Sequence, residues 1–134
     1  MVAARPTAIA LCLFVGLAQV YAQTRADALQ MYRQGRYDQA RETCLAEISE
    51  NPSNIESYVV LVWSLLALGR YQDAELYGTR AFTSVRRDPR IAHSLGEAAF
   101  NLGKNDVAIG RFRDYINLLP EGAQIGSADR KSVV

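Results

Sequence analysis

Apolar residues in the middle of the chain recur at steps of three and four, the spacing of one face of an α-helix. Gly69 lies between two such stretches, and a glycine there can adopt the left-handed backbone that ends a helix without a Cβ clash. The pattern therefore predicts two helices joined by a tight turn. The first helix would present Tyr58, Leu61, Val62, Leu65 and Leu66, and the second, over residues 71–85, would present Ala74, Tyr77, Ala81, Phe82 and Val85.

The same pattern recurs with a period of 34 residues. At the average usage of glycine, a chance column of three has odds of about one in 200 once the first member is fixed. Each unit reads as a helical hairpin, and about three hairpins are needed to cover one another's apolar sides. No stretch shows the alternation typical of a strand. The matching columns are Gly35, Gly69 and Gly103, then Ala40, Ala74 and Ala108, then Ile48, Phe82 and Ile116.

Further residues indicate where the predicted helices begin and end. Pro52 and Pro120 lie two periods apart, and proline cannot continue a helix. Ser53, followed by Glu56 three residues later, has the pattern of a capping box at a helix start. Asp88 directly precedes a proline, which is the arrangement expected at the first turn of a helix. These signals place hairpin boundaries at the same points as the period of 34.

These columns resemble the tetratricopeptide repeat family over residues 24–122. The glycines and alanines match family positions, as do the aromatic residues Tyr37 and Tyr71. The sequence departs from the family at Arg86, where a proline is usual, and at Asn105, where an aromatic residue is usual. The resemblance implies an all-α fold, a right-handed superhelix of antiparallel helix pairs with about six helices. Its units would be residues 23–54, 55–88 and 89–122.

The resemblance also implies a binding surface, because the first helices of such units line a concave groove that holds a partner protein or peptide. Trp63 would point into this groove from the central unit, although Trp63 could instead belong to the core. Exposed aromatic residues beside apolar ones are frequent at binding sites. The groove positions are Leu29, Tyr32, Arg33, Val59, Trp63, Leu66, Arg90, His93, Glu97, Phe100 and Asn101.

One subclass of the family holds a peptide's C-terminal carboxylate with a clamp of lysine, arginine and asparagine side chains. Leu29 and Val60 stand where such a clamp needs asparagine, and only Arg90 fits it. The sequence therefore predicts an apolar or helical ligand.

The first 22 residues have the pattern of a secretory signal peptide. Residues 8–20 are apolar over a stretch too short to span a bilayer, and Val20 and Ala22 are small residues placed for cleavage before Gln23. An uncleaved anchor is the alternative. We expect an exported protein, periplasmic or secreted, with no stable membrane span after cleavage.

The composition predicts a protein without catalytic, metal or cofactor chemistry. The 15 basic and 14 acidic side chains nearly balance, which disfavours nucleic acid as a partner. His93 is the only histidine, and once the signal is removed Cys44 is the only cysteine. One histidine and one cysteine cannot by themselves form a zinc site, and Cys44 is expected to be a buried, inert thiol. We therefore predict no catalytic residues, no metal ligands and no cofactor.

The end of the chain, residues 123–134, has the register of another first helix but is short and contains Gly126. It suggests a truncated next repeat, which would leave Ile109, Phe112 and Ile116 poorly covered. The leading functional hypothesis is an exported protein-binding adaptor or scaffold. The alternatives are a structural, self-associating envelope component that forms a homo-oligomer through the open C-terminal end, and the N-terminal fragment of a longer repeat protein.

Overall fold

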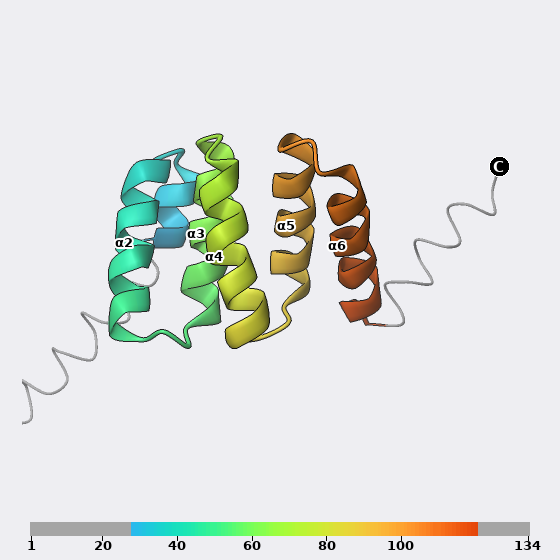
Figure 1. Ribbon diagram of the computed structural model, residues 1–134. Coiled ribbons are helices and arrows are strands. Elements are labelled where there is room, and N and C mark those ends of the chain that lie inside the picture. Colours follow the sequence, from blue (N-terminus) through green and yellow to red (C-terminus); the bar gives the residue numbers. More distant parts are fainter. Residues whose placement is uncertain (1–27, 121–134) are drawn as a thin grey trace, which may run out of the picture.

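A computed structural model describes residues 28–120, and every regular element in this range is a helix. Residues 28–33 are helical, and five complete helices follow (Figure 1). Their bounds are α2 (Tyr37–Glu50), α3 (Ile55–Ala67), α4 (Tyr71–Ser84), α5 (Pro89–Asn101) and α6 (Asn105–Leu118). Each helix packs against the next one along the chain, and α3 also packs against α5. The predicted all-α stack of antiparallel helix pairs is confirmed. The predicted signal and the 123–134 tail lie outside the described residues.

The three glycines of the 34-residue period make the turns within the hairpins. Gly35, Gly69 and Gly103 have φ of 75°, 70° and 75°, and no other residue between 28 and 120 has a positive φ. After α3, the Gly69 N–H donates to the Leu66 carbonyl at 3.0 Å, and the next N–H donates to the Leu65 carbonyl at 2.8 Å. This pair of bonds satisfies carbonyls that the end of a helix leaves unpaired. The predicted role of these glycines is therefore confirmed.

One predicted helix start is confirmed and another is wrong. The Asp88 side chain accepts a hydrogen bond from the Arg90 N–H at 2.9 Å, with Pro89 as the first residue of α5. The capping box at Ser53 does not form, because α3 begins one residue later, after Asn54. The Ser53 N–H instead donates to the Asn51 side chain at 3.2 Å, a local turn that competes with capping.

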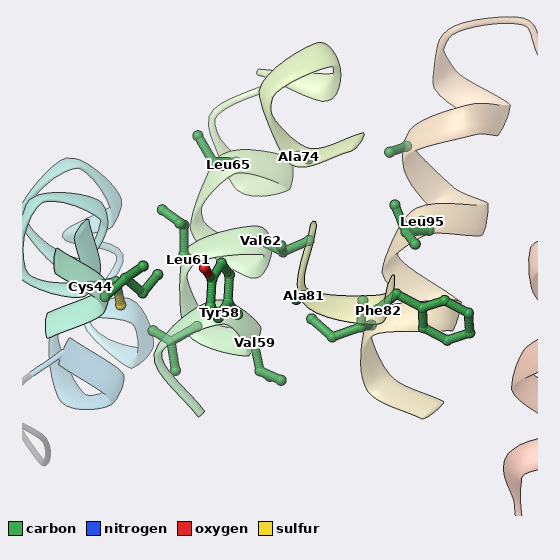
Figure 2. Close-up of a cluster of buried hydrophobic side chains, with 14 of the residues drawn as sticks. Cys44, Tyr58, Val59, Leu61, Val62, Leu65, Ala74, Ala81, Phe82 and Leu95 are labelled. Atoms are coloured by element: carbon green, nitrogen blue, oxygen red, sulfur yellow. The ribbon is translucent and has the colours of Figure 1, made fainter. Parts of the chain in front are cut away.

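The core lies around α3, which packs against α2, α4 and α5. The side chains of α3 fill the space between Cys44 of α2 and Leu95 of α5 (Figure 2). Eight of its thirteen residues are buried, including polar Ser57 and Ser64. The alanine column is buried in all three hairpins, which lets the paired helices approach closely. Its members are Ala40, Ala74 and Ala108.

Two glycines in the last two hairpins have large side chains directly against them. A Cβ added at Gly78 of α4 would come within 2.8 Å of Leu95 on α5, whereas Val62 of α3 would lie 3.7 Å away. A Cβ added at Gly96 would come within 2.6 Å of the Phe112 ring. Gly78 therefore accommodates a side chain from the next hairpin, whereas Gly96 of α5 accommodates one from α6 in its own hairpin.

Candidate partner-binding surface

The first helices of the hairpins are residues 28–33, α3 and α5. Two columns of the 34-residue period lie on them, and we call the six residues of these two columns the first-helix face. The central member is Trp63, which is half-buried and packs against the core. The columns are Leu29, Trp63 and Glu97, and Tyr32, Leu66 and Phe100.

Aromatic contacts order the centre of this face. The rings of Tyr32 and Trp63 have centroids 5.7 Å apart, and Tyr32 also lies 5.4 Å from Tyr37. Such contacts between rings add to the free energy gained by burial. Burial, followed by Coulombic interactions with Tyr37 and Glu97, raises the pKa of Tyr32.

The predicted groove residues differ in how much surface they offer. Phe100 is 65% exposed, more than any other large hydrophobic residue described. Leu29, Tyr32, Trp63, Leu66 and Arg90 are intermediate, whereas Arg33, His93, Glu97 and Asn101 are exposed. Val59 departs from the expectation, because it is only 1% exposed. It lies on α3, the central first helix, whereas His93 at the same register of α5 is exposed.

His93 belongs to a second aromatic group that sequence reasoning missed. Its ring lies edge-on to Phe112 at 5.7 Å and to Tyr115 at 5.2 Å, both on α6. The signal in the sequence was present, because His93 and Phe112 flank the Gly103 turn at distances expected for facing helices. This group gives the last hairpin its own polar and aromatic surface, apart from the Tyr32–Trp63 pair.

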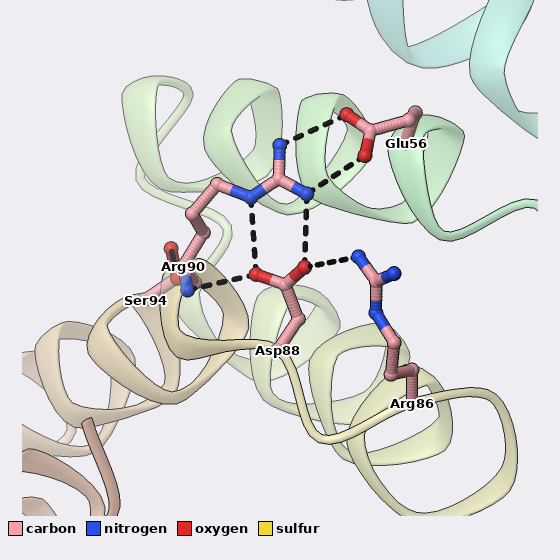
Figure 3. Close-up of polar contacts among 5 residues, drawn as sticks. All are labelled: Glu56, Arg86, Asp88, Arg90 and Ser94. Carbon is pink, nitrogen blue, oxygen red and sulfur yellow. Dashed lines mark hydrogen bonds and ion pairs between the residues drawn. The ribbon is translucent and has the colours of Figure 1, made fainter. Parts of the chain in front are cut away.

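Arg90 was expected to face a partner, but its side chain is engaged within the chain (Figure 3). Its Nη1 and Nη2 donate to the two carboxylate oxygens of Glu56 at 2.9 and 2.8 Å. Its Nε and Nη2 donate to Asp88 at 3.0 and 2.9 Å, and Arg86 adds a further bond to Asp88 at 2.8 Å. Bidentate pairs of this kind are strong and directional. The network joins the starts of α3 and α5. Arg90, the one residue that fits a carboxylate clamp, is therefore already bound to Glu56 and Asp88.

The same contacts set the protonation of the network. The hydrogen bond from Arg90 lowers the pKa of Glu56 and outweighs the opposing effect of burial. Burial alone would raise the pKa of Asp88, but hydrogen bonds from Arg90 and Arg86 outweigh it and lower the pKa to about 2. Hydrogen bonds to Glu56 and Asp88 raise the pKa of Arg90. All three groups are charged at neutral pH.

The described residues give little basis for metal or nucleophilic chemistry. Between residues 28 and 120, no three histidine, cysteine, aspartate or glutamate side chains gather as metal ligands would. Cys44 is a buried free thiol, and burial followed by the charge of Glu47 raises its pKa to about 12. A thiol with that pKa stays protonated and is a poor nucleophile. None of the helices in this range has the length and apolar content needed to cross a membrane.

The stacked hairpins, with a patterned face on their first helices, define the class of helical-repeat proteins. The tetratricopeptide repeat family profile matches residues 24–90 and 59–124, and the chain belongs to this family. Among solved structures, it is similar to the Yersinia enterocolitica type III secretion translocator chaperone SycD (alternative dimer). That match has 17% identity and a TM-score of 0.71, and it covers 80% of this chain and 83% of that chain. No curated protein matches the sequence.

Proposed function

We propose that this chain is a non-catalytic adaptor that holds an apolar or helical segment of a partner protein against the first-helix face. The observation that carries the proposal is the position of Trp63, half-buried against Tyr32, with the exposed Phe100 one unit further along. Tryptophan and tyrosine dominate the free energy of many protein interfaces, because they add large apolar area with few rotatable bonds. Membership of the tetratricopeptide repeat family and the fold shared with a chaperone support this proposal.

The test compares two exposed apolar positions on different faces. Phe100→Ser removes apolar area from the first-helix face, whereas Leu76→Ser removes it from the exposed side of α4. Proteins captured by the wild-type chain would be identified by mass spectrometry and their binding to each variant measured. We expect Phe100→Ser and Trp63→Ala to weaken capture at least tenfold and Leu76→Ser to leave it unchanged. Equal loss in Phe100→Ser and Leu76→Ser would contradict the proposal.

The proposal includes export, with residues 1–22 as a cleaved signal and the periplasm or the external medium as destination. The support is the apolar stretch at residues 8–20 followed by Val20 and Ala22. Mass spectrometry of the protein from the exported fraction should find Gln23 at the N-terminus. A chain that retains Met1 in that fraction would favour the uncleaved anchor.

Self-association through α6 is the second candidate function. Ile109 is 51% exposed on α6, where another hairpin would pack in a longer stack. Light scattering of wild type and Ile109→Asp would test it, with Val107→Asp as the matched control, since Val107 is also an exposed apolar residue of α6. A dimer lost only in Ile109→Asp would support this role, and a monomer in all three proteins would exclude it.

A further inference from the structure

A pocket of about 210 Å³ opens at the edge of the first-helix face, between residues 28–33, α2 and α3. Sites for drug-sized ligands run from about 300 to 1,000 Å³, so a pocket of this size suits a single side chain. One part of its wall is apolar and another part carries carboxylates. Its lining residues are Ala28, Leu29, Cys44, Glu47, Glu56, Ser57 and Val60.

Glu47 is the unusual member of this lining. The equivalent residues of the other two hairpins, one and two periods later, are Ala81 and Tyr115, and Ala81 is fully buried between helices. Neither equivalent residue is an acid, so a carboxylate at this register is particular to the first hairpin. Packing within the hairpins gives no reason for a charge there.

The Glu47 carboxylate is held at one oxygen only. The Ser57 hydroxyl donates to Glu47 Oε2, and Ser57 in turn accepts a hydrogen bond from the Asn54 side chain at 2.6 Å. The other oxygen, Oε1, is buried and has no hydrogen-bond partner in the described part of the chain. A buried carboxylate oxygen without a donor is costly, and a cationic donor entering the pocket would remove that cost.

The charges around the pocket favour a cation. Glu56, the second carboxylate of the lining, is bound by Arg90, which also binds Asp88 together with Arg86. Together with Glu47, this group has three carboxylates and two guanidinium groups, so one negative charge remains. The apolar wall of Leu29, Cys44 and Val60 suits an aliphatic stem. A long basic side chain combines such a stem with a charged end.

We propose that this pocket binds the side chain of an arginine, or of a lysine in its place, on the partner segment that lies against the first-helix face. Leu29 belongs both to that face and to the pocket, so one ligand can reach both. The planar fork of arginine suits a carboxylate better than an ammonium does. The claim that this side chain belongs to a partner segment rests on the proposed function. The claim that the pocket binds a basic side chain does not.

The pocket is tested first without any partner. The full chain is titrated with n-butylguanidinium, which reproduces an arginine side chain, and with n-butylurea, its neutral counterpart, while backbone amide shifts are followed by NMR. We expect saturable shifts at Leu29, Cys44, Ser57 and Val60 with millimolar affinity, and binding of n-butylurea weaker by about fivefold or more. Equal binding of the two probes, or shifts elsewhere only, would overturn the proposal.

Two variants identify the group that recognises the cation. Glu47→Gln should weaken n-butylguanidinium by about fivefold or more, whereas Glu50→Gln, an exposed glutamate on the same helix, should not change it. Equal affinities in these two variants would contradict a role for Glu47. Arg25→Ala tests another occupant, an arginine of the same chain that precedes Ala28 of the lining by three residues in the sequence. A rise in probe affinity in that variant would assign the pocket to Arg25 and overturn the proposal.

Partner capture then separates this inference from the proposed function. If Trp63→Ala leaves capture intact, the proposed function fails while the probe titration still decides the pocket. If Trp63→Ala abolishes capture and Glu47→Gln weakens it by about fivefold or more, both stand. If Glu47→Gln and Glu50→Gln capture the partner equally well, the pocket has no part in partner binding. In that case the inference fails while the proposed function stands.

Discussion

The middle hairpin, α3 with α4, and the last hairpin, α5 with α6, carry the same columns of residues but bury them differently. Within each hairpin the alanine column is buried, as Ala74 and Ala108 show. Between hairpins the outcome diverges, because Phe82 is 5% exposed and Ile116, one period later, is 49% exposed. The packing between the two helices of a hairpin therefore depends on residues of that hairpin alone. The outer side of its second helix is buried only where another hairpin follows.

The largest expected effect comes from truncating the two members of this column. Phe82→Ala should lower the free energy of unfolding by about 3–5 kcal/mol, because it leaves a cavity at a buried site. It also removes the ring that Arg87 and Arg111 cover at 5.1 and 5.3 Å. Ile116→Ala should cost less than about 1.5 kcal/mol, because half of that side chain is already exposed. Urea unfolding followed by circular dichroism measures both, and equal costs would mean that the two hairpins do not differ in burial.

A smaller effect is expected at the junction between the two hairpins, where Asp88 caps α5 and binds two arginines. Asp88→Asn keeps a capping side chain but loses the charge, and should cost about 1–2 kcal/mol at pH 7. Asp106→Asn, an exposed acid in the first turn of α6, should cost less than about 1 kcal/mol. Thermal unfolding of the two variants beside wild type measures the difference.

The pH dependence gives the sign of this contribution. The pKa of Asp88 in the folded chain is about 2, below its ordinary value of 3.8, so its charge stabilises the fold above pH 3.8. That stabilisation is lost as the pH falls from 3.8 towards 2. The gap in stability between wild type and Asp88→Asn should therefore narrow in this range. A difference in stability that stays constant down to pH 2.5 would show that the charge of Asp88 does not stabilise the fold.

The sequence predicted the elements that depend on local rules. The turn glycines Gly35, Gly69 and Gly103 follow from backbone sterics, and the cap at Asp88 follows from the proline after it. The burial of Val59 could not be read from its register, because His93, which has the same register one period later, is exposed.

The side-chain contacts between units were the least predictable part. Glu56 was interpreted as half of a capping box, whereas it binds Arg90 one period away. Arg90 lies 34 residues from Glu56, and the periodicity places the two on neighbouring first helices without saying that they pair. The Glu47–Ser57 contact likewise joins α2 to α3 and has no local signature. Repeat patterns thus predict which helices are neighbours better than which polar side chains meet.

The smallest expected effects come from two glycines in the last hairpin, and they test how tightly it is closed. Gly96 faces the Phe112 ring at a distance that leaves no room for a Cβ, whereas nothing lies within 4 Å of a Cβ added at Gly110. Gly96→Ala should therefore destabilise the fold by about 1 kcal/mol, because the half-buried ring must move to make room. Gly110→Ala should stabilise it by about 0.5–1 kcal/mol, since alanine restricts the unfolded chain and favours helix. Urea midpoints that shift in opposite directions would show that α5 and α6 pack closely at Gly96, and a stabilising Gly96→Ala would show that they do not.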